Sequence, residues 1–164
     1  MSRSPGMRAW AWLGVAGVAA LDLVSKVLAH LYLSPLEASP QHSWLQLGLV
    51  MNPGMSLGIE SQHPRLAVTL SALSIVVLAA WLYRARTPLQ VAALALALGG
   101  GLGNLIDRLA HGAVTDWIHL NPYAPTFNLA DVAIRTGLVT ALAALIGTSM
   151  QPKQPLPIKP RNQP

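Results

Sequence analysis

The chain has 164 residues, of which 52% are apolar and only 10% charged, so it has too little polar surface to cover a soluble globular domain. Its net charge of +5 and isoelectric point near 10.3 would suit a nucleic-acid-binding protein, but the basic residues gather at the ends of apolar runs, which indicates lipid instead. The chain contains no cysteine, which excludes disulfides, thiolate zinc sites, thiol nucleophiles and lipidation on cysteine.

Four apolar segments are long enough to cross a membrane as helices, since about 20 residues span the roughly 30 Å of hydrocarbon in a bilayer. They are Trp10–Leu31, Leu66–Tyr83, Leu89–Ile106 and Leu129–Met150. The first could instead be a signal peptide cut after Ala20, but its apolar stretch continues to Leu33, which favours a membrane helix. We therefore predict an all-α integral membrane protein with four transmembrane helices, a single domain over residues 1–150 and a Pro-rich, disordered tail over residues 151–164.

Lysine and arginine residues at the ends of these segments predict the orientation, because cytoplasmic loops carry an excess of them. Only Arg65 and Arg108 fall on one side, whereas the other side carries Arg3, Arg8, Arg84, Arg86, Lys153, Lys159 and Arg161. We therefore predict that both termini are cytoplasmic. The loops Tyr32–Pro64 and Arg108–Asn128 then lie together on the extracytoplasmic face.

Two charged residues lie within the first segment, four positions apart, so Asp22 and Lys26 share one face of the helix. An ionisable group at membrane depth is a candidate for function, but pairing also lowers the cost of burying two charges. We favour a structural ion pair over a catalytic role for these two residues, and expect Lys26 to extend towards the outer face.

The third segment ends in GGGLGNLIDRL, which combines closely spaced glycines with two charges. Gly99 and Gly103 form a small-xxx-small pattern that lets another helix approach closely, and the lysine of a phosphate-binding loop is missing. Asp107 falls at the C-terminal end of a helix, where the macrodipole disfavours a negative charge. It should therefore have a partner, such as Arg108 or an amide, in a structural network.

Two further carboxylates stand at the predicted outer edge of the membrane. Asn128 could cap the fourth helix with Asp131 at its third position, which by itself would explain both residues. Asp116 lies in the loop before Trp117 and has no such explanation. Two carboxylates in a partly dry site do not both ionise easily, so one keeps a proton while the other can accept one from water. Asp116 and Asp131 are therefore candidates for an aspartic protease dyad.

Other catalytic patterns have weaker support. The stretch Gly54–Gly58 matches the G-x-S-x-G nucleophile elbow, but it follows Asn52 and Pro53 in a loop and lacks the strand, helix and spaced histidine that would make Ser56 a nucleophile. Ser25 and Lys26 are neighbours on a helix and point apart, so they do not form a dyad. The five histidines form no H-x-x-x-H pair, which gives a metal site little support.

A small transporter or channel subunit is the alternative from another class. In that interpretation Asp22, Lys26 and Asp131 line an ion path, and the NPG of residues 52–54 forms a re-entrant loop. A transporter predicts polar residues through the whole depth of the bilayer, whereas here they concentrate near the outer edge. A catalytically inactive relative is a further alternative, against which the presence of both candidate aspartates argues.

Five short motifs, taken in chain order, together resemble one protein family. DLVSK, NPGMSLG, GNLIDR, VTDWI and FNLAD are similar to the signature of bacterial lipoprotein signal peptidase, or signal peptidase II, and they cover all four segments and both outer loops. The resemblance implies an intramembrane aspartic endopeptidase that removes the signal peptide of diacylglyceryl-modified prolipoproteins just before the lipidated cysteine. It implies a monomer in the bacterial cytoplasmic (inner) membrane with an extracytoplasmic active site, partnered by prolipoproteins and membrane lipid, without nucleic acid, metal or cofactor.

The resemblance also implies roles for individual residues. Asp116 and Asp131 would be catalytic, Asp22 and Lys26 structural, and the site would be supported by Asn52, Gly54, Asn104, Asp107, Arg108 and Asn128. In the family the first outer loop forms a small β platform with a short helix, which we expect within Tyr32–Pro64. The chain departs from the pattern at Leu57, usually aromatic, at Val132, usually serine, and in a short linker between the aspartates. These departures predict altered packing around the substrate more than lost catalysis.

Overall fold

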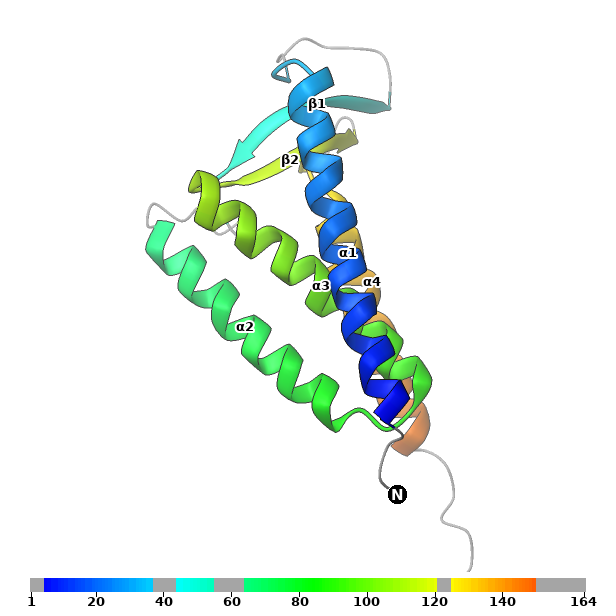
Figure 1. Ribbon diagram of the computed structural model, residues 1–164. Helices are drawn as coiled ribbons and strands as arrows, with labels where there is room; N and C mark the ends of the chain where they lie inside the picture. The colour runs from blue at the N-terminus through cyan, green and yellow to red at the C-terminus, as the bar shows by residue number, and fades with distance from the viewer. Residues whose placement is uncertain (1–4, 37–43, 55–63, 121–124, 150–164) are drawn as a thin grey trace, which may run out of the picture.

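The computed structural model describes residues 5–36, 44–54, 64–120 and 125–149. Its helices are α1 (Pro5–Tyr32), α2 (Pro64–Arg84), α3 (Pro88–His111) and α4 (Leu129–Ser149), and its strands are β1 (Leu45–Asn52) and β2 (Val114–Leu120) (Figure 1). All four helices are long and apolar enough to cross a membrane, which confirms the four predicted segments. The predicted tail, residues 151–164, lies outside the described residues.

Helix α3 is the central element of the bundle, because it packs against α1, α2 and α4. Glycines permit these close contacts: a Cβ on Gly99 would lie 2.7 Å from the carbonyl oxygen of Val15 in α1, and one on Gly100 would lie 2.6 Å from that of Ala130 in α4. The predicted small-xxx-small contact is therefore present. Gly112, with a φ of 73°, ends α3 in the left-handed conformation that glycine adopts readily.

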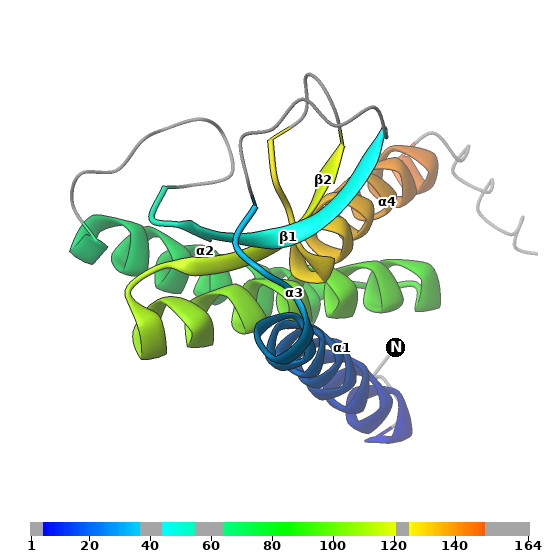
Figure 2. The same cartoon turned by 90° about the horizontal axis from the view of Figure 1, so that it is seen from above.

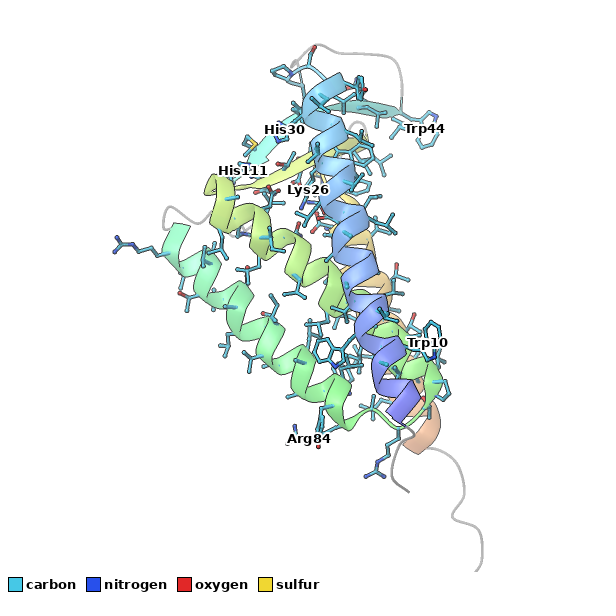
Figure 3. The ribbon with its side chains drawn as sticks, viewed as in Figure 1. Trp10, Lys26, His30, Trp44, Arg84 and His111 are labelled. Carbon is cyan, nitrogen blue, oxygen red and sulfur yellow. The ribbon has the colours of Figure 1, made fainter. Side chains whose placement is uncertain are left out.

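The buried core is small and apolar side chains also cover the outside of the helices. Leu94 and Leu98 of α3 are almost fully buried, whereas Leu13, Val76 and Val139 on the three surrounding helices are more than half exposed. Helices that are apolar on all faces suit a surrounding of lipid. Trp10 is 75% exposed near the start of α1 (Figure 3), a position typical of the membrane interface.

The strands β1 and β2 form an antiparallel two-stranded sheet across one end of the bundle (Figures 1 and 2). We call this end, which carries Leu45–Asn52 and Val114–Leu120, the sheet end; α1 begins and α4 ends at the opposite end (Figure 1). The small predicted sheet is present, but only β1 comes from the loop between the first two helices. The second strand lies between α3 and α4 and contains Asp116, which the sequence analysis placed in a loop.

The short helix expected within Tyr32–Pro64 is absent from the described part of that loop, and residues 37–43 and 55–63 lie outside the described residues. Ser56 and Leu57 fall in the second of these gaps. A bulge separates the pairs Leu47 with Ile118 and Val50 with Asp116 in the sheet.

Candidate active site

A cavity of about 860 Å³ runs between α2, α3 and α4 from the sheet end towards the middle of the bundle. Within the described residues α2 packs against α3 and against no other helix, so the space between α2 and α4 is left to this cavity. The lining is polar at the sheet end, at Asn52, Asn104, Arg108, Asp116 and Asp131. Further from the sheet it is mostly apolar, at Ile75, Leu78, Trp81, Ile134 and Leu138. Such a site offers a few polar groups beside a long apolar surface.

Asp116 reaches the cavity from β2, and the backbone of this strand also fixes the start of α4. Phe127 forms a bridge with Ile118, through hydrogen bonds of 2.9 Å from the amide of Phe127 and 3.0 Å from the amide of Ile118. The amide of Trp117 donates to the same carbonyl oxygen of Phe127, at 3.1 Å. Ile118, two positions after Asp116, is thereby held against Phe127, which directly precedes Asn128.

Asn128 caps α4, and Asp131 occupies the third position of that helix. The side-chain oxygen of Asn128 accepts a hydrogen bond of 3.0 Å from the backbone amide of Asp131, and the carboxylate of Asp131 accepts one of 3.4 Å from the backbone amide of Asn128. Asp22 of α1 satisfies a third amide at this helix start, because Ala130 donates to it at 2.8 Å. The helix start is thus held by its own residues and by α1.

Two asparagines connect the candidate aspartates. The side-chain nitrogen of Asn128 donates to Asp116 at 2.7 Å and lies 3.2 Å from the side-chain oxygen of Asn104. Asn104 in turn donates to Asp131 at 3.0 Å. The sequence analysis implied these two asparagines and both aspartates for one site, and the structure brings all four together.

Asp116 is fully buried, with both carboxyl oxygens in hydrogen bonds. One accepts from Asn128 and the other from the side chain of Asn52 at 2.9 Å. Burial raises the pKa of Asp116 from 3.8 to about 6 and the charge of Asp131 adds to the rise, whereas the hydrogen bonds from Asn52 and Asn128 oppose it. A carboxyl group with this pKa can hold or release a proton near neutral pH.

Arg108 and Gly54 complete the polar end of the cavity. The guanidinium of Arg108 donates to the carbonyl oxygen of Gly54 at 2.8 Å, and the amide of Gly54 donates to the side chain of Asn52 at 2.9 Å. Arg108 therefore holds the NPG turn of residues 52–54 against α3. Asn52 belongs to this turn and donates to Asp116, so the turn also helps to fix the carboxyl group of Asp116. All three residues implied by the family resemblance line the cavity.

The remaining charges form a buried cluster beside the cavity. The ammonium of Lys26 lies 2.7 Å from Asp22, 3.4 Å from Asp107 and 2.8 Å from the side-chain oxygen of Asn104. Lys26 is 3% exposed, so the expectation that it extends towards the outer face is wrong: two carboxylates and an amide oxygen hold it inside. Gly103 makes room for this cluster, because a Cβ there would lie 2.5 Å from Asp22.

Asp107 has an amide as its partner, one of the two possibilities suggested by sequence, and not Arg108. It accepts a hydrogen bond of 2.6 Å from the backbone amide of Thr115 and pairs with His111 at 2.7 Å. Sequence reasoning missed Thr115 and His111, and also His30, which lies 3.1 Å from the hydroxyl of Thr115. Of these contacts, only the one between Asp107 and His111 had a signal in the sequence, namely their i to i+4 spacing on a helix.

Two other residues weighed in the sequence analysis lie apart from this network. Ser25 donates to the carbonyl oxygen of Asp22 at 2.7 Å, so its hydroxyl serves the backbone of its own helix. Val132 is 46% exposed and is not among the residues that line the cavity. Among the described residues, no three His, Asp or Glu side chains come together as metal ligands would.

Known proteins share both the sequence pattern and the fold. Residues 15–147 match the family described as signal peptidase (SPase) II. A lipoprotein signal peptidase of Moorella thermoacetica is 41% identical over 125 residues, which cover 74% of this chain and 83% of the relative. One of Yersinia pseudotuberculosis is 42% identical over 150 residues, or 85% of this chain and 86% of the relative. A solved bacterial membrane enzyme shares the fold, with a TM-score of 0.75 at 24% identity over 90% of this chain and 94% of that one.

Proposed function

Because the chain belongs to the signal peptidase II family, we propose that it is an aspartic endopeptidase that cuts diacylglyceryl-modified prolipoproteins just before the lipidated cysteine. The family and the four apolar helices make it a multi-pass bacterial membrane protein. The observation that carries the proposal is that Asp116, from β2, and Asp131, from α4, line the polar end of the same cavity. Asn128 touches both residues.

We assign the proton that the pair needs for catalysis to Asp116, whose pKa is raised towards neutral pH, and the role of base to Asp131. Asp116 is fully buried and its pKa is raised to about 6 by burial first and then by the charge of Asp131. Asp131 stands at the third position of α4, where the helix dipole stabilises a negative charge, and it accepts a hydrogen bond from Asn104. An apolar substrate that fills the cavity removes water and favours the protonated form of Asp116 further.

The chemistry follows from one ionised and one protonated carboxyl group. Asp131 accepts a proton from a water molecule whose oxygen attacks the scissile carbonyl carbon, while the proton of Asp116 stabilises the developing oxyanion. The carbon–nitrogen bond of the tetrahedral intermediate then breaks, and a proton from the pair goes to the leaving amine. The products are the carboxylate of the signal peptide and the free amine of the lipidated cysteine, and no metal or cofactor is required.

The apolar part of the cavity suits the apolar core of a signal peptide. Its walls come from α2 and α4, at side chains such as Leu78 and Ile134. Because α2 packs against α3 alone among the described helices, a substrate can approach sideways from the bilayer between α2 and α4. We place the sheet end on the extracytoplasmic face of the inner membrane and both termini in the cytoplasm, with residues 1–150 as one peptidase domain.

The transporter alternative receives less support from this arrangement. It predicts polar groups through the bilayer depth, but the buried charges gather in the half of the bundle nearest the sheet end, at Asp22, Lys26, Asp107, Arg108, Asp116 and Asp131. Further from the sheet end, the lining of the cavity is mostly apolar, with side chains such as Trp81 and Leu138.

The test of the proposed substrate is a cleavage assay with purified wild-type protein in lipid nanodiscs. A diacylglyceryl-modified prolipoprotein should give a product whose N-terminal residue is the lipidated cysteine, identified by mass spectrometry. The same prolipoprotein without the diacylglyceryl group is the matched control and should be cut much more slowly. Absence of cleavage, or a cut at another bond, would contradict the proposal.

A further inference from the structure

Two histidines meet Asp107 and Thr115 at the sheet end, outside the polar contacts that surround the candidate dyad. His111 Nδ1 lies 2.7 Å from Oδ1 of Asp107, and the hydroxyl of Thr115 lies 3.4 Å from the same oxygen. His30 Nε2 lies 3.1 Å from the hydroxyl of Thr115. The two imidazole rings are 6.1 Å apart between centroids, and Figure 3 shows them together near the start of β2.

Asp107 is the common acceptor of this group. The carboxylate of Asp107 accepts from the backbone amide of Thr115, from the hydroxyl of Thr115 and from His111. We assign the hydrogen of the Thr115 hydroxyl to the carboxylate of Asp107, and in this assignment the hydroxyl accepts from Nε2 of His30. With this assignment both histidines are donors, and they hold the Asp107–Thr115 unit from two sides.

This group joins three elements at the point where β2 begins. His30 belongs to α1, Asp107 and His111 to α3, and Thr115 to β2. Thr115 and Asp107 are buried, whereas the side chain of His111 is 53% exposed. Neither histidine lines the cavity, so neither can touch a substrate bound there. Any effect of these histidines on catalysis is therefore indirect, through the buried residues Asp107 and Thr115.

Thr115 is the residue through which such an effect would reach the dyad. It directly precedes Asp116, and its carbonyl oxygen accepts from the side chain of Asn128 at 3.3 Å, the same nitrogen that donates to Asp116. Its amide is fixed by Asp107 at 2.6 Å. Since catalytic groups lose much of their effect when displaced by about 1 Å, the backbone position of Thr115 decides whether Asp116 is aligned.

We infer that His30 and His111 are positioning residues of the dyad: they hold the Asp107–Thr115 unit, and through it the carboxyl group of Asp116, in the place required for proton transfer. The inference rests on the proposed function and deepens it. It extends the site from the cavity to the solvent-exposed corner between α1, α3 and β2.

A purely structural role is the alternative, because a histidine in the last turn of α3 also complements the helix dipole. In that case replacement of His111 would lower the melting temperature and leave the turnover of the folded protein unchanged. A positioning role instead lowers kcat in protein that is still folded, with little change in KM, because the substrate-binding surface is untouched.

The experiment measures kcat, KM and melting temperature for paired variants of each histidine. His111→Ala and His30→Ala remove the donors, while His111→Asn and His30→Gln place an amide nitrogen near Nδ1 and Nε2 respectively. His119→Ala is the matched control, since it removes an imidazole from β2, the strand that contains Thr115, at the position that pairs with Gln46. Each alanine variant should lose about tenfold in kcat, and each amide variant should recover to within about threefold of wild type.

The double variant adds a second readout. Because both histidines act through the same Asp107–Thr115 unit, the combined loss in His30→Ala/His111→Ala should be smaller than the product of the two single losses. Unchanged kcat in both alanine variants, or amide variants as slow as the alanine ones, would overturn the inference. Wild-type protein that cuts no prolipoprotein would instead overturn the proposed function, which separates the two failures.

Discussion

The side-chain amide of Asn128 lies 2.7 Å from the carboxyl group of Asp116, so the residue that caps α4 also holds the buried carboxyl group of β2. Capping alone would be served by any short polar side chain with an oxygen. Only an amide can cap the helix through its oxygen and donate to a carboxyl group through its nitrogen at the same time. The geometry therefore explains why an asparagine stands at this position.

Replacement of Asn128 by serine separates these two tasks. Serine is as good a helix cap as asparagine, so the Asn128→Ser variant should keep the start of α4 and fold, with a melting temperature lower by a few degrees because buried oxygens of Asp116 and Asn104 lose a donor. It lacks the nitrogen that donates to Asp116, and loss of a hydrogen bond to a carboxyl group corresponds to about 10- to 100-fold in kcat. A Ser variant with wild-type kcat would show that this contact is dispensable, and Thr87→Ser, at the cap of α3, is the matched control.

Gly103 is predicted to be essential for the buried charge cluster. A Cβ in the Gly103→Ala variant would lie 2.5 Å from the carboxylate of Asp22, which already pairs with Lys26. Overpacking of this kind costs about 1–3 kcal/mol, and we expect a melting temperature lower by several degrees. In the matched Gly17→Ala variant the Cβ meets no atom within 4 Å, so the melting temperature should be unchanged or slightly raised. Equal melting temperatures for both variants would contradict the packing described for α1 and α3.

The raised pKa of Asp116 predicts a pH dependence of stability. The pKa is 3.8 in the unfolded chain and about 6 in the fold, so the folded state binds the proton more tightly. The resulting stabilisation is full below the unfolded value and is lost as the pH rises through about 6, by about 3 kcal/mol. The melting temperature of wild type relative to Asp116→Asn should fall between pH 4 and pH 7. A constant difference over this range would show that Asp116 is not held in a dry site.

The absence of cysteine makes the proposed orientation simple to test. Trp44, beside β1, is 73% exposed, and Arg86 is exposed in the short link 85–87 between α2 and α3, so a cysteine at either place can react with a reagent. A membrane-impermeant maleimide should label Trp44→Cys in intact spheroplasts and Arg86→Cys only after lysis. The reverse pattern of labelling would place the sheet end and the dyad in the cytoplasm.

Most of the helical architecture could be predicted from sequence, because hydrophobic length alone defines a membrane span. The span predicted at Leu129–Met150 begins at the same residue as α4, and the others agree with the helices to within a few residues. The start of α4 was accurate because Asn128 and Asp131 are local signals, readable from neighbouring residues. The sheet was predicted in the first outer loop, where β1 lies.

The features that were missed depend on contacts between distant residues. The strand β2 exists because its backbone pairs with β1 and with Phe127, and a seven-residue stretch with an aspartate at its third position carries no sign of those partners. The direction of Lys26 was wrong because Asp107 and Asn104 lie on another helix. His30 and Thr115 are 85 positions apart, so no spacing rule connects them. Tertiary contacts of this kind set the geometry of the site.

The cleavage rate of two near-isosteric variants, Asp116→Asn and Asp131→Asn, tests the central claim most directly. Each removes one carboxyl group of the proposed dyad while its size and one of its two acceptor oxygens are kept, and folding is checked by melting temperature. If Asp116 and Asp131 together activate water, both variants fold and each loses at least about 1000-fold in kcat on a diacylglyceryl-modified prolipoprotein. A folded variant of either kind that cuts at a rate near that of wild type would contradict the assignment of the dyad.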